Sequence, residues 1–341
     1  MHNKNDLLDL IIIGAAAAGT TAAIYAARRN LNFVVIAKDI GGEVALSGEV
    51  ANWPGIIKTT GFELAQEFKK HVESYGVKIE EGWEVKSLKK DGNIHIVFAE
   101  NAVGDKKEFK TKAIIIASGI HPRHLNIPGE EEFKGKGVTY CTVCDGPLFK
   151  NKITATIGAG NSALESALMM AGIAKKVYLV TKYTDTKENN GGFLKGENIL
   201  IDKVKALNNV EIIYNVRTTE ILGDGVVSGI KYTENTSDKN LSTEVLTKED
   251  AKVEKHIEVQ GVMVHIGMTP NSDFVTCGKK NKVGEIEVDI KCKTDCSGVF
   301  AAGDVTNIPY KQIAIAAGHG VTAALSAIEY INKWEDKGKT Q

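Results

Sequence analysis

The 341-residue sequence lacks a dominant charge of either sign. Its 42 lysine and arginine residues nearly balance its 43 aspartate and glutamate residues, so the formal net charge is −1. Without a strong field of one sign, neither nucleic acid nor an anionic membrane is a favoured partner. Apolar residues make up 43% of the chain, as in ordinary globular proteins, and the length suffices for two domains with full cores.

Cysteine and proline are also scarce. Only two of the five cysteines have motif spacing, so they do not form the disulfide framework of a small secreted protein. We therefore expect a reducing, cytoplasmic setting. The six prolines stand against 34 glycines, a ratio typical of α/β chains with many tight strand–helix turns.

The longest apolar stretch is not continuous. Leu7–Ala27 is interrupted by Gly14 and Gly19, and Asp6 and Asp9 lie at its start. A buried strand that leads directly into a buried helix has the same hydropathy. We prefer that interpretation to a signal peptide or a membrane span.

Hydrophobic periodicity predicts an α/β chain with two β-α-β units. Each unit has a strand, a glycine turn, a helix and a second strand: Leu8–Ile13, Gly14–Gly19, Thr20–Arg29 and Phe33–Ala37, then Ile153–Ile157, Gly158–Ala163, Leu164–Ala171 and Val177–Val180. Further helices are expected at Phe62–Tyr75 and Gln312–Trp334.

The other strand patterns complete two domains. A meander is expected at Val85–Leu88, Ile94–Phe98 and Phe109–Thr111, a second strand set at Val210–Tyr214, Glu220–Leu222 and Val226–Tyr232, and buried strands at Ala113–Ala117, Val259–Ile266 and Val299–Ala302. We predict two Rossmann-like three-layer domains, each with a β-meander, one inserted in the other. Residues 1–120 and 259–341 form the outer domain and residues 121–258 the inner one. The polar segment Asn235–Lys255 is expected to be a surface hairpin or loop.

The first glycine turn has the outline of a dinucleotide site. Gly14 and Gly19 match the first and last glycine roles, but Ala16 stands where a middle glycine usually lets the backbone approach a pyrophosphate. Asp39 is the acid that follows the second strand, and it is equally compatible with a simple turn. Alone, this turn does not decide between nucleotide binding and ordinary packing.

The second glycine turn, residues 158–163, matches the dinucleotide pattern more closely, with alanine at the permitted third position. The residues after its second strand select between NADH and NADPH. Lys182 and Lys187 can offer point charges to a 2′-phosphate, without the two-pronged contact of arginine. The same lysines are compatible with simple solvation, so the donor stays open with a preference for NADPH.

Between the two turns lies a Cys-x-x-Cys motif, Cys141 and Cys144, followed by Asp145. Oxidised, such a pair accepts two electrons, and reduced, its thiolate attacks other disulfides. Asp145 could protonate a leaving thiolate. The alternatives are inert core cysteines, or a zinc site completed by His121 and His124 in a redox-sensing module that is not an enzyme.

Three cysteines lie outside any motif: Cys277, Cys292 and Cys296. The spacing of the last two does not suit a redox pair, and we expect ordinary side chains on strands or turns.

Together these segments resemble the low-molecular-weight thioredoxin reductases over nearly the whole chain. The matching stretches are Gly41-Gly42, Asn52-Trp53-Pro54-Gly55, Ala117-Ser118-Gly119, Arg123, Ile127–Glu130, Tyr140–Gly146, Gly298–Val305 and Tyr310–Ile313. The C-terminal part is also similar to the flavoprotein of alkyl hydroperoxide reductase, whose additional N-terminal thioredoxin-like domains we do not expect in these 341 residues.

The resemblance implies that NAD(P)H reduces FAD, and that FAD reduces a Cys141–Cys144 disulfide through Cys144. After a rotation of the inner domain, Cys141 attacks the disulfide of thioredoxin or a glutaredoxin-like protein. FAD contacts are expected from Gly14, Ala16, Gly19, Asp39, Gly41, Gly42, Glu43, Asn52, Ser118, Gly119, Gly303, Asp304, Lys311, Gln312 and Ile313. NAD(P)H contacts are expected from Gly158, Gly160, Asn161, Ser162, Ala163, Lys182 and Lys187. Asp304 is expected to bind the flavin ribityl chain, and the family members are homodimers.

The sequence departs from this family at three places. The basic string that binds NADPH is replaced by Thr181–Lys187, Glu43 replaces a common glutamine, and His319 replaces a common glutamate. The first departure leaves reduced ferredoxin or another flavin donor open as the electron source.

Overall fold

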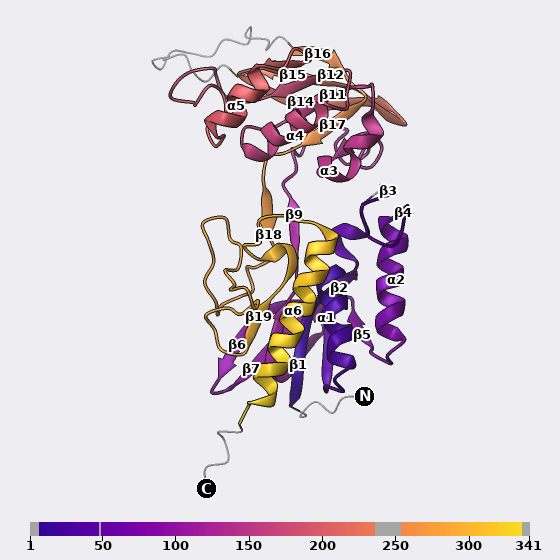
Figure 1. The fold of residues 1–341 in the computed structure, drawn as a ribbon, viewed down its shortest axis with the longest axis vertical. Coiled ribbons are helices and arrows are strands. Elements are labelled where there is room, and N and C mark those ends of the chain that lie inside the picture. The colour runs from indigo at the N-terminus through magenta and orange to yellow at the C-terminus, as the bar shows by residue number, and fades with distance from the viewer. Residues whose placement is uncertain (1–6, 48, 236–253, 336–341) are drawn as a thin grey trace. The chain divides into compact units, whose positions relative to one another are not determined.

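The computed structural model describes residues 7–47, 49–235 and 254–335. The chain forms two compact units, the first from Met1–His121 and Thr269–Gln341 and the second from Pro122–Met268. The second unit interrupts the first in sequence. Two short strands, β9 (Ile120–Pro122) and β18 (Met268–Pro270), pair with each other where the chain passes between the units (Figure 1).

The predicted return to the outer domain at residue 259 is ten residues early. The strand β17 (Gly261–Val264), which the sequence pattern assigns to the outer domain, pairs in parallel with β11 (Ile153–Ile157) in the sheet of the second unit. Its apolar sequence suits a central strand of either domain, so hydropathy could not assign it. Most of the polar segment 235–255 lies outside the described residues.

The first unit is built on a seven-stranded sheet in the order β5-β2-β1-β8-β7-β6, with β19 also beside β8. The strands are β1 (Leu8–Ala15), β2 (Phe33–Ile40), β5 (Ile79–Glu81), β6 (Trp83–Asp91), β7 (Ile94–Asn101), β8 (Lys106–Ile116) and β19 (Val299–Ala301). The beginning of β8 pairs antiparallel with β7, and its end runs parallel between β1 and β19. The third meander strand and the buried strand predicted at 113–117 are therefore parts of one strand.

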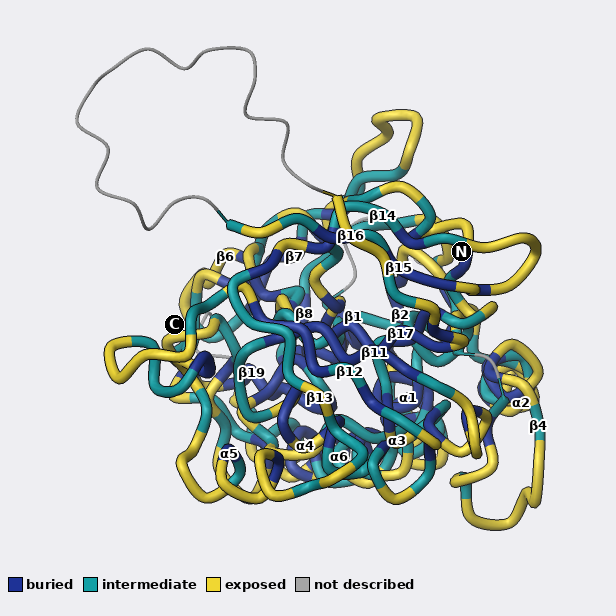
Figure 2. The backbone as a smooth tube through the Cα atoms, turned by 90° about the horizontal axis from the view of Figure 1, so that it is seen from above, coloured by how far each residue is buried: buried dark blue, intermediate teal, exposed yellow. Residues whose placement is uncertain are grey.

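Alternate residues of β1 face two different cores. Leu10 and Ile12 pack with the helices α1 (Ala17–Ala27) and α6 (Ile313–Asn332), and Ile11 and Ile13 pack with the β6–β7 hairpin. Both faces of the parallel strands are thus covered, which explains the continuous apolar sequence of β1. Burial follows this arrangement, with the tube dark along β1 and β8 (Figure 2). The three layers confirm the predicted fold class.

The helices of the first unit form where the apolar periodicity predicts them. The helix α2 (Gly61–Glu73) begins at Thr60, whose hydroxyl accepts from the Glu63 amide while the Glu63 carboxylate accepts from the Thr60 amide. Two short helical turns, η1 (Gly42–Val44) and η3 (Gly303–Val305), and the strand pair β3 (Glu49–Val50) and β4 (Thr59–Thr60) complete this unit.

The helices α6 and α1 lie side by side (Figure 1). They can approach closely because Gly320 has no side chain. A Cβ at this position would lie only 2.2 Å from the Ala18 carbonyl oxygen. Among the described helices, α6 alone has the length and composition of a membrane-crossing helix, with a mean hydropathy of 1.2. Its contacts with α1, β8 and β19 are those of a helix packed on a sheet.

The second unit contains a five-stranded parallel sheet in the order β10-β17-β11-β12-β13. The remaining elements are β10 (Val138–Thr139), β12 (Lys176–Val180), β13 (Val210–Ile213), the helices α3 (Thr142–Asp145), α4 (Asn161–Ala171) and α5 (Asn198–Lys205), and the turn η2 (Gly146–Phe149). A separate antiparallel sheet has the order β14 (Val216–Asp224), β15 (Val226–Glu234) and β16 (Glu254–Glu258). The grouping of Val210–Tyr214 in one strand set with Glu220–Leu222 and Val226–Tyr232 is wrong, because β13 extends the parallel sheet.

Candidate active site

Four parallel strands of the first unit end at the same edge of its sheet, the edge where open α/β sheets bind ligands. Most residues predicted to bind FAD lie there: Gly14, Ala16 and Gly19 at β1, Asp39, Gly41, Gly42 and Glu43 at β2, Ser118 and Gly119 after β8, and Gly303 and Asp304 after β19. Asn52 joins Gln312, since its Nδ2 donates to Gln312 Oε1 at 3.3 Å. Gln312 is the N-cap of α6, and Ile313 is its first residue.

The first glycine turn leaves no room for side chains. A Cβ at Gly14 would lie 2.2 Å from the Ala117 carbonyl oxygen, and one at Gly19 would lie 1.9 Å from the Gly14 oxygen. Gly14 also has a φ of 110°, which favours glycine. Ala16 is the N-cap of α1 and provides no side-chain cap, so amide groups of the first turn remain open to an anion.

Asp304 carries a buried carboxylate oxygen, Oδ1, that has no hydrogen-bond partner among the described residues. Burial raises the pKa of Asp304 to about 6, and the nearby charge of Lys311 opposes that rise. A buried acceptor without a donor is costly. A hydroxyl of a bound ligand would remove that cost, so Asp304 fits the contact with a ribityl chain that the family resemblance implies.

The two substituted family positions both lie at this edge. The Glu43 carboxylate accepts a hydrogen bond from Nδ1 of His121 at 2.6 Å, and this bond raises the pKa of His121. The negative charge of Glu43 also raises the pKa of Asp304. His319 lies on α6, where its Nδ1 accepts from the Gly303 amide at 3.4 Å.

Asn271 supports the site and was missed in the sequence. Its carbonyl oxygen accepts from Ser118 Oγ at 2.6 Å, and its side-chain amide donates to the Ser118 carbonyl at 2.8 Å. Its backbone amide donates to the carbonyl of Gly119. The only sequence signal was its place directly after Pro270, at the end of a crossing strand.

The second glycine turn is equally tight and belongs to the second unit. A Cβ at Gly158 would lie 2.3 Å from the carbonyl oxygen of His265. Asn161 and Glu197 exchange hydrogen bonds of 2.9 and 2.8 Å, which attach the loop after β12 to the start of α4. Gly160 is the N-cap of α4 and has no side-chain cap, so this helix start is also open to an anion.

The remaining residues predicted to bind NAD(P)H lie around this turn. Ala163 is fully buried and Ser162 is exposed. Lys182 and Lys187 follow the carboxyl end of β12 and are exposed, and within the described residues neither forms an ion pair. Lys182 Nζ lies 5.1 Å from the centre of the Tyr183 ring. Both lysines are therefore accessible positive charges.

Cys141 and Cys144 are joined by a disulfide, with Cα atoms 5.3 Å apart. Cys141 is the N-cap of α3, and its Sγ accepts from the backbone amide of Cys144 at 3.2 Å. Both residues are half-buried. A disulfide that is partly accessible at the start of a short helix is open to exchange with another dithiol.

Asp145, at the end of the same helix, is held by a neighbouring strand. Its Oδ2 accepts a hydrogen bond from the Thr139 hydroxyl, and its buried Oδ1 has no partner among the described residues. Burial raises the pKa of Asp145, and the bond from Thr139 opposes that rise. The carboxyl group therefore retains a proton to higher pH than an exposed aspartate, as a proton donor beside the cysteines requires.

A buried polar network anchors the helix between the cysteines. The Thr142 hydroxyl lies 2.8 Å from Nε2 of His265 and 2.6 Å from the Ser166 hydroxyl. Burial lowers the pKa of His265 to about 4, so its ring is neutral at physiological pH. The network ties α3 to α4 and to the segment after β17. It was not foreseen, since these three residues are far apart along the chain and belong to no motif.

The structure does not favour the zinc alternative. His121 binds Glu43, His124 Nδ1 lies 3.0 Å from the Tyr140 hydroxyl, and the two cysteines are bonded to each other. Among the described residues, no group of three or more histidine, cysteine or acidic side chains could hold a metal ion.

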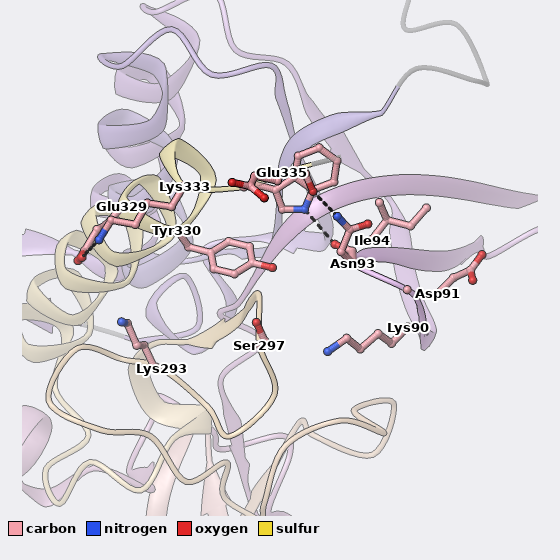
Figure 3. Close-up of a pocket in the computed structure, with 12 residues that line it drawn as sticks. Lys90, Asp91, Asn93, Ile94, Lys293, Ser297, Glu329, Tyr330, Lys333 and Glu335 are labelled. Carbon is pink, nitrogen blue, oxygen red and sulfur yellow. Dashed lines mark hydrogen bonds and ion pairs between the residues drawn. The ribbon is translucent and has the colours of Figure 1, made fainter. Parts of the chain in front are cut away.

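A hollow of about 960 Å³ lies elsewhere on the first unit (Figure 3). It is formed by the β6–β7 turn, the end of α6 and the segment around Lys293 and Ser297. Trp334 Nε1 donates to the Asn93 carbonyl at 3.0 Å across one side of it. Its lining contains none of the predicted site residues, and its lysines are mixed with carboxylates.

The chain is similar to several known bacterial proteins. It is 38% identical to the F subunit of alkyl hydroperoxide reductase from Escherichia coli (strain K12) over 335 residues, and 36% identical to an NADH dehydrogenase of Bacillus subtilis (strain 168) over 324 residues. These matches cover 96% and 95% of this chain but only 59% and 58% of the relatives, so the chain spans less than two thirds of their length.

Among solved structures, the thioredoxin reductase of Streptococcus pyogenes MGAS5005 has a TM-score of 0.83 and 29% identity, covering 97% of this chain and all of that one. The model of the pyridine nucleotide-disulphide oxidoreductase family matches residues 8–320. That match includes both glycine turns, the Cys-x-x-Cys motif and Asp304. The chain therefore belongs to the pyridine nucleotide-disulphide oxidoreductase family.

Proposed function

We propose that this protein is a thioredoxin-disulfide reductase. In this proposal two electrons pass from NADPH or NADH through FAD to the Cys141–Cys144 disulfide, and then to thioredoxin or a similar small dithiol protein. The observation that carries the proposal is the half-buried disulfide at the start of α3, followed by a buried carboxyl group of raised pKa. The full-length likeness to a thioredoxin reductase structure supports it.

The residues of this chain have distinct roles in the proposal. FAD, when bound, takes electrons from the nicotinamide and makes them available to the disulfide. The glycine turns would offer backbone amides to the phosphates and Asp304 would accept from a ribityl hydroxyl. Asn52 holds Gln312, the N-cap of α6. Reduction breaks the bond between Cys141 and Cys144, and Asp145 supplies a proton to a departing thiolate. Cys141 then attacks the disulfide of the partner protein, and Cys144 releases the reduced partner by re-forming the original disulfide.

The proposal is tested by anaerobic titration of the purified protein with NADPH and with NADH, followed by visible absorbance. We expect a yellow protein whose flavin absorbance bleaches with at least one donor, and subsequent reduction of added thioredoxin. A bleached flavin with no reduction of thioredoxin or glutaredoxin would reject the disulfide substrate. A yellow protein that neither nucleotide bleaches would favour reduced ferredoxin or another flavin as donor. A colourless protein would reject the flavoenzyme altogether.

Replacing Asp304 with alanine is expected to weaken FAD binding about 10- to 100-fold, because a hydrogen bond to a charged group is lost. The measurement is the dissociation constant of FAD from the apoprotein, by quenching of flavin fluorescence. Asp91→Ala is the matched control, since Asp91 is an exposed aspartate of the same unit at the β6–β7 turn. Equal affinity in wild type and Asp304→Ala would contradict the role of Asp304.

We propose NADPH as the preferred donor, because Lys182 and Lys187 are accessible positive charges after β12. The relatives named NADH dehydrogenases make NADH the alternative. Replacing Lys182 with glutamate is expected to lower kcat/KM for NADPH about tenfold, equivalent to about 1.4 kcal/mol, with little effect on NADH. Lys175→Glu, at the other end of β12, is the control. An equal loss with both nucleotides would show that Lys182 does not read the 2′-phosphate.

A second partner is favoured by the relatives named as F subunits of alkyl hydroperoxide reductase. In this second proposal the chain delivers electrons to a thioredoxin-like module of a peroxide-reducing system. Parallel assays with thioredoxin and with such a module separate the two partners. We propose a homodimer in the cytoplasm, which sedimentation of the purified protein and fractionation of its cells would test.

A further inference from the structure

A second pair of cysteines lies in the first unit. Cys277 and Cys296 are bonded to each other, with Cα atoms 5.7 Å apart and a separation of 19 positions in sequence. This separation of Cα atoms is ordinary for a disulfide. Cys296 is 7% exposed and packs in the core beside Ile286 and Val305, and Cys277 is half-buried against the same core. The expectation that Cys296 is an ordinary side chain is therefore wrong. The spacing of Cys277 and Cys296 in the sequence does not reveal the pair, because only the fold of the chain between them brings the two residues together.

The pair closes an otherwise irregular loop. From Asn271 to Gly298, a stretch that the structure describes completely, the chain forms isolated bridges but no helix or longer strand. Ordering such a loop costs conformational entropy, and a covalent bond that closes it lowers that cost. A disulfide between Cys277 and Cys296 should therefore have a large effect on the order of this loop.

The closed loop is hydrogen-bonded to the segment that carries Asp304. The Ile286 amide donates to the Val305 carbonyl at 2.9 Å, and the Asn307 amide donates to the Ile286 carbonyl at 3.0 Å. The neighbouring Glu285 also forms an ion pair of 2.9 Å with Lys311. The closed loop is therefore attached directly to η3 and to the segment before α6.

We propose that Cys277 and Cys296 are a second thiol–disulfide couple, separate from the Cys-x-x-Cys pair, whose oxidation fixes the Asp304 segment. A low-molecular-weight disulfide is the oxidant. The Cys277 thiolate attacks one of its sulfurs and releases one thiolate, forming a mixed disulfide. The Cys296 thiolate then attacks Cys277 Sγ and releases the second thiolate. The oxidant gains two electrons, and the two released thiolates take up the protons that the cysteines lost.

The test uses the full chain with Cys141→Ser, Cys144→Ser and Cys292→Ser, so that only Cys277 and Cys296 can pair. The protein is equilibrated in glutathione buffers from fully reduced to fully oxidised, and free thiols are alkylated and counted by mass spectrometry. On oxidation we expect loss of both alkylation sites and a rise of about 5 °C in the thermal midpoint. Amide hydrogen exchange of residues 284–288 and 303–308 should slow about tenfold. The same protein with Cys277→Ser is the control, and none of these changes should appear in it.

Two results would overturn the proposal. One is alkylation of both cysteines at every glutathione ratio, which would show that the couple does not form. The other is a disulfide that forms without slower exchange around Asp304, which would show that the bond does not order that segment. Neither readout depends on turnover or on the identity of the protein substrate, so failure here is distinguishable from failure of the proposed reductase function.

Discussion

Cys144→Ser is expected to abolish reduction of thioredoxin by the protein, with a loss of about 10³-fold or more in kcat/KM. The serine hydroxyl cannot form the disulfide with Cys141, so the two-electron acceptor is absent. Bleaching of the flavin by NAD(P)H should be unchanged, because the glycine turns and Asp304 are untouched. The measurement pairs stopped-flow absorbance of the flavin with steady-state reduction of thioredoxin.

Cys292→Ser is the matched control for this experiment. Cys292 is a buried single thiol, and burial raises its pKa to about 12, which makes it unreactive at neutral pH. We expect the control to reduce thioredoxin at the wild-type rate. A Cys144→Ser protein with more than a tenth of wild-type activity would reject the role of the dithiol and leave electron transfer directly from flavin as the reaction.

The fold was predictable from sequence wherever one element carries its own pattern. The apolar run of β1, the glycine turn after it and the alanine-rich α1 predicted a complete β-α-β unit. The structure forms that unit, with α1 beginning at Ala17, inside the predicted turn. The prediction of sheet membership failed for strands whose sequence is compatible with either of two sheets. β13 and β17 are apolar strands whose places depend on pairing with β12 and β11, and pairing between distant segments leaves no local mark in the sequence.

The same division holds for the site. The glycines of the two turns can be recognised in the sequence, because the backbone conformation and close packing at Gly14 and Gly158 exclude other residues. Cys141 and Cys144 are visible by their spacing. Thr139, Thr142 and His265 act through contacts that only the fold creates, and threonine and histidine are common enough that their presence predicts nothing. Cys277 and Cys296 belong to this second group, since the loop between them determines that they meet.

Asp145→Asn is expected to lower the rate of disulfide reduction about 10²-fold, the usual contribution of a positioned acid. The amide keeps the shape of the side chain and a hydrogen bond with Thr139, but it has no proton to give to a departing thiolate. The wild-type rate depends on the protonated acid. It should therefore fall as the pH rises through the raised pKa of Asp145, and the asparagine variant should lack this step.

Thr139→Val tests the role of Asp145 in a second way. This substitution should shift the pH at which the rate falls, whereas Asp145→Asn should abolish the fall. The Thr139 hydroxyl lowers the pKa of Asp145 against the larger effect of burial, so its loss should raise that pKa further. The fall in rate should then occur at higher pH than in wild type, with activity retained below it. The check is the pH profile of single-turnover reduction of the Cys141–Cys144 disulfide in the three proteins. If the step lies at the same pH in wild type and in both variants, another group donates the proton, and Asp145 contributes only to the packing of α3.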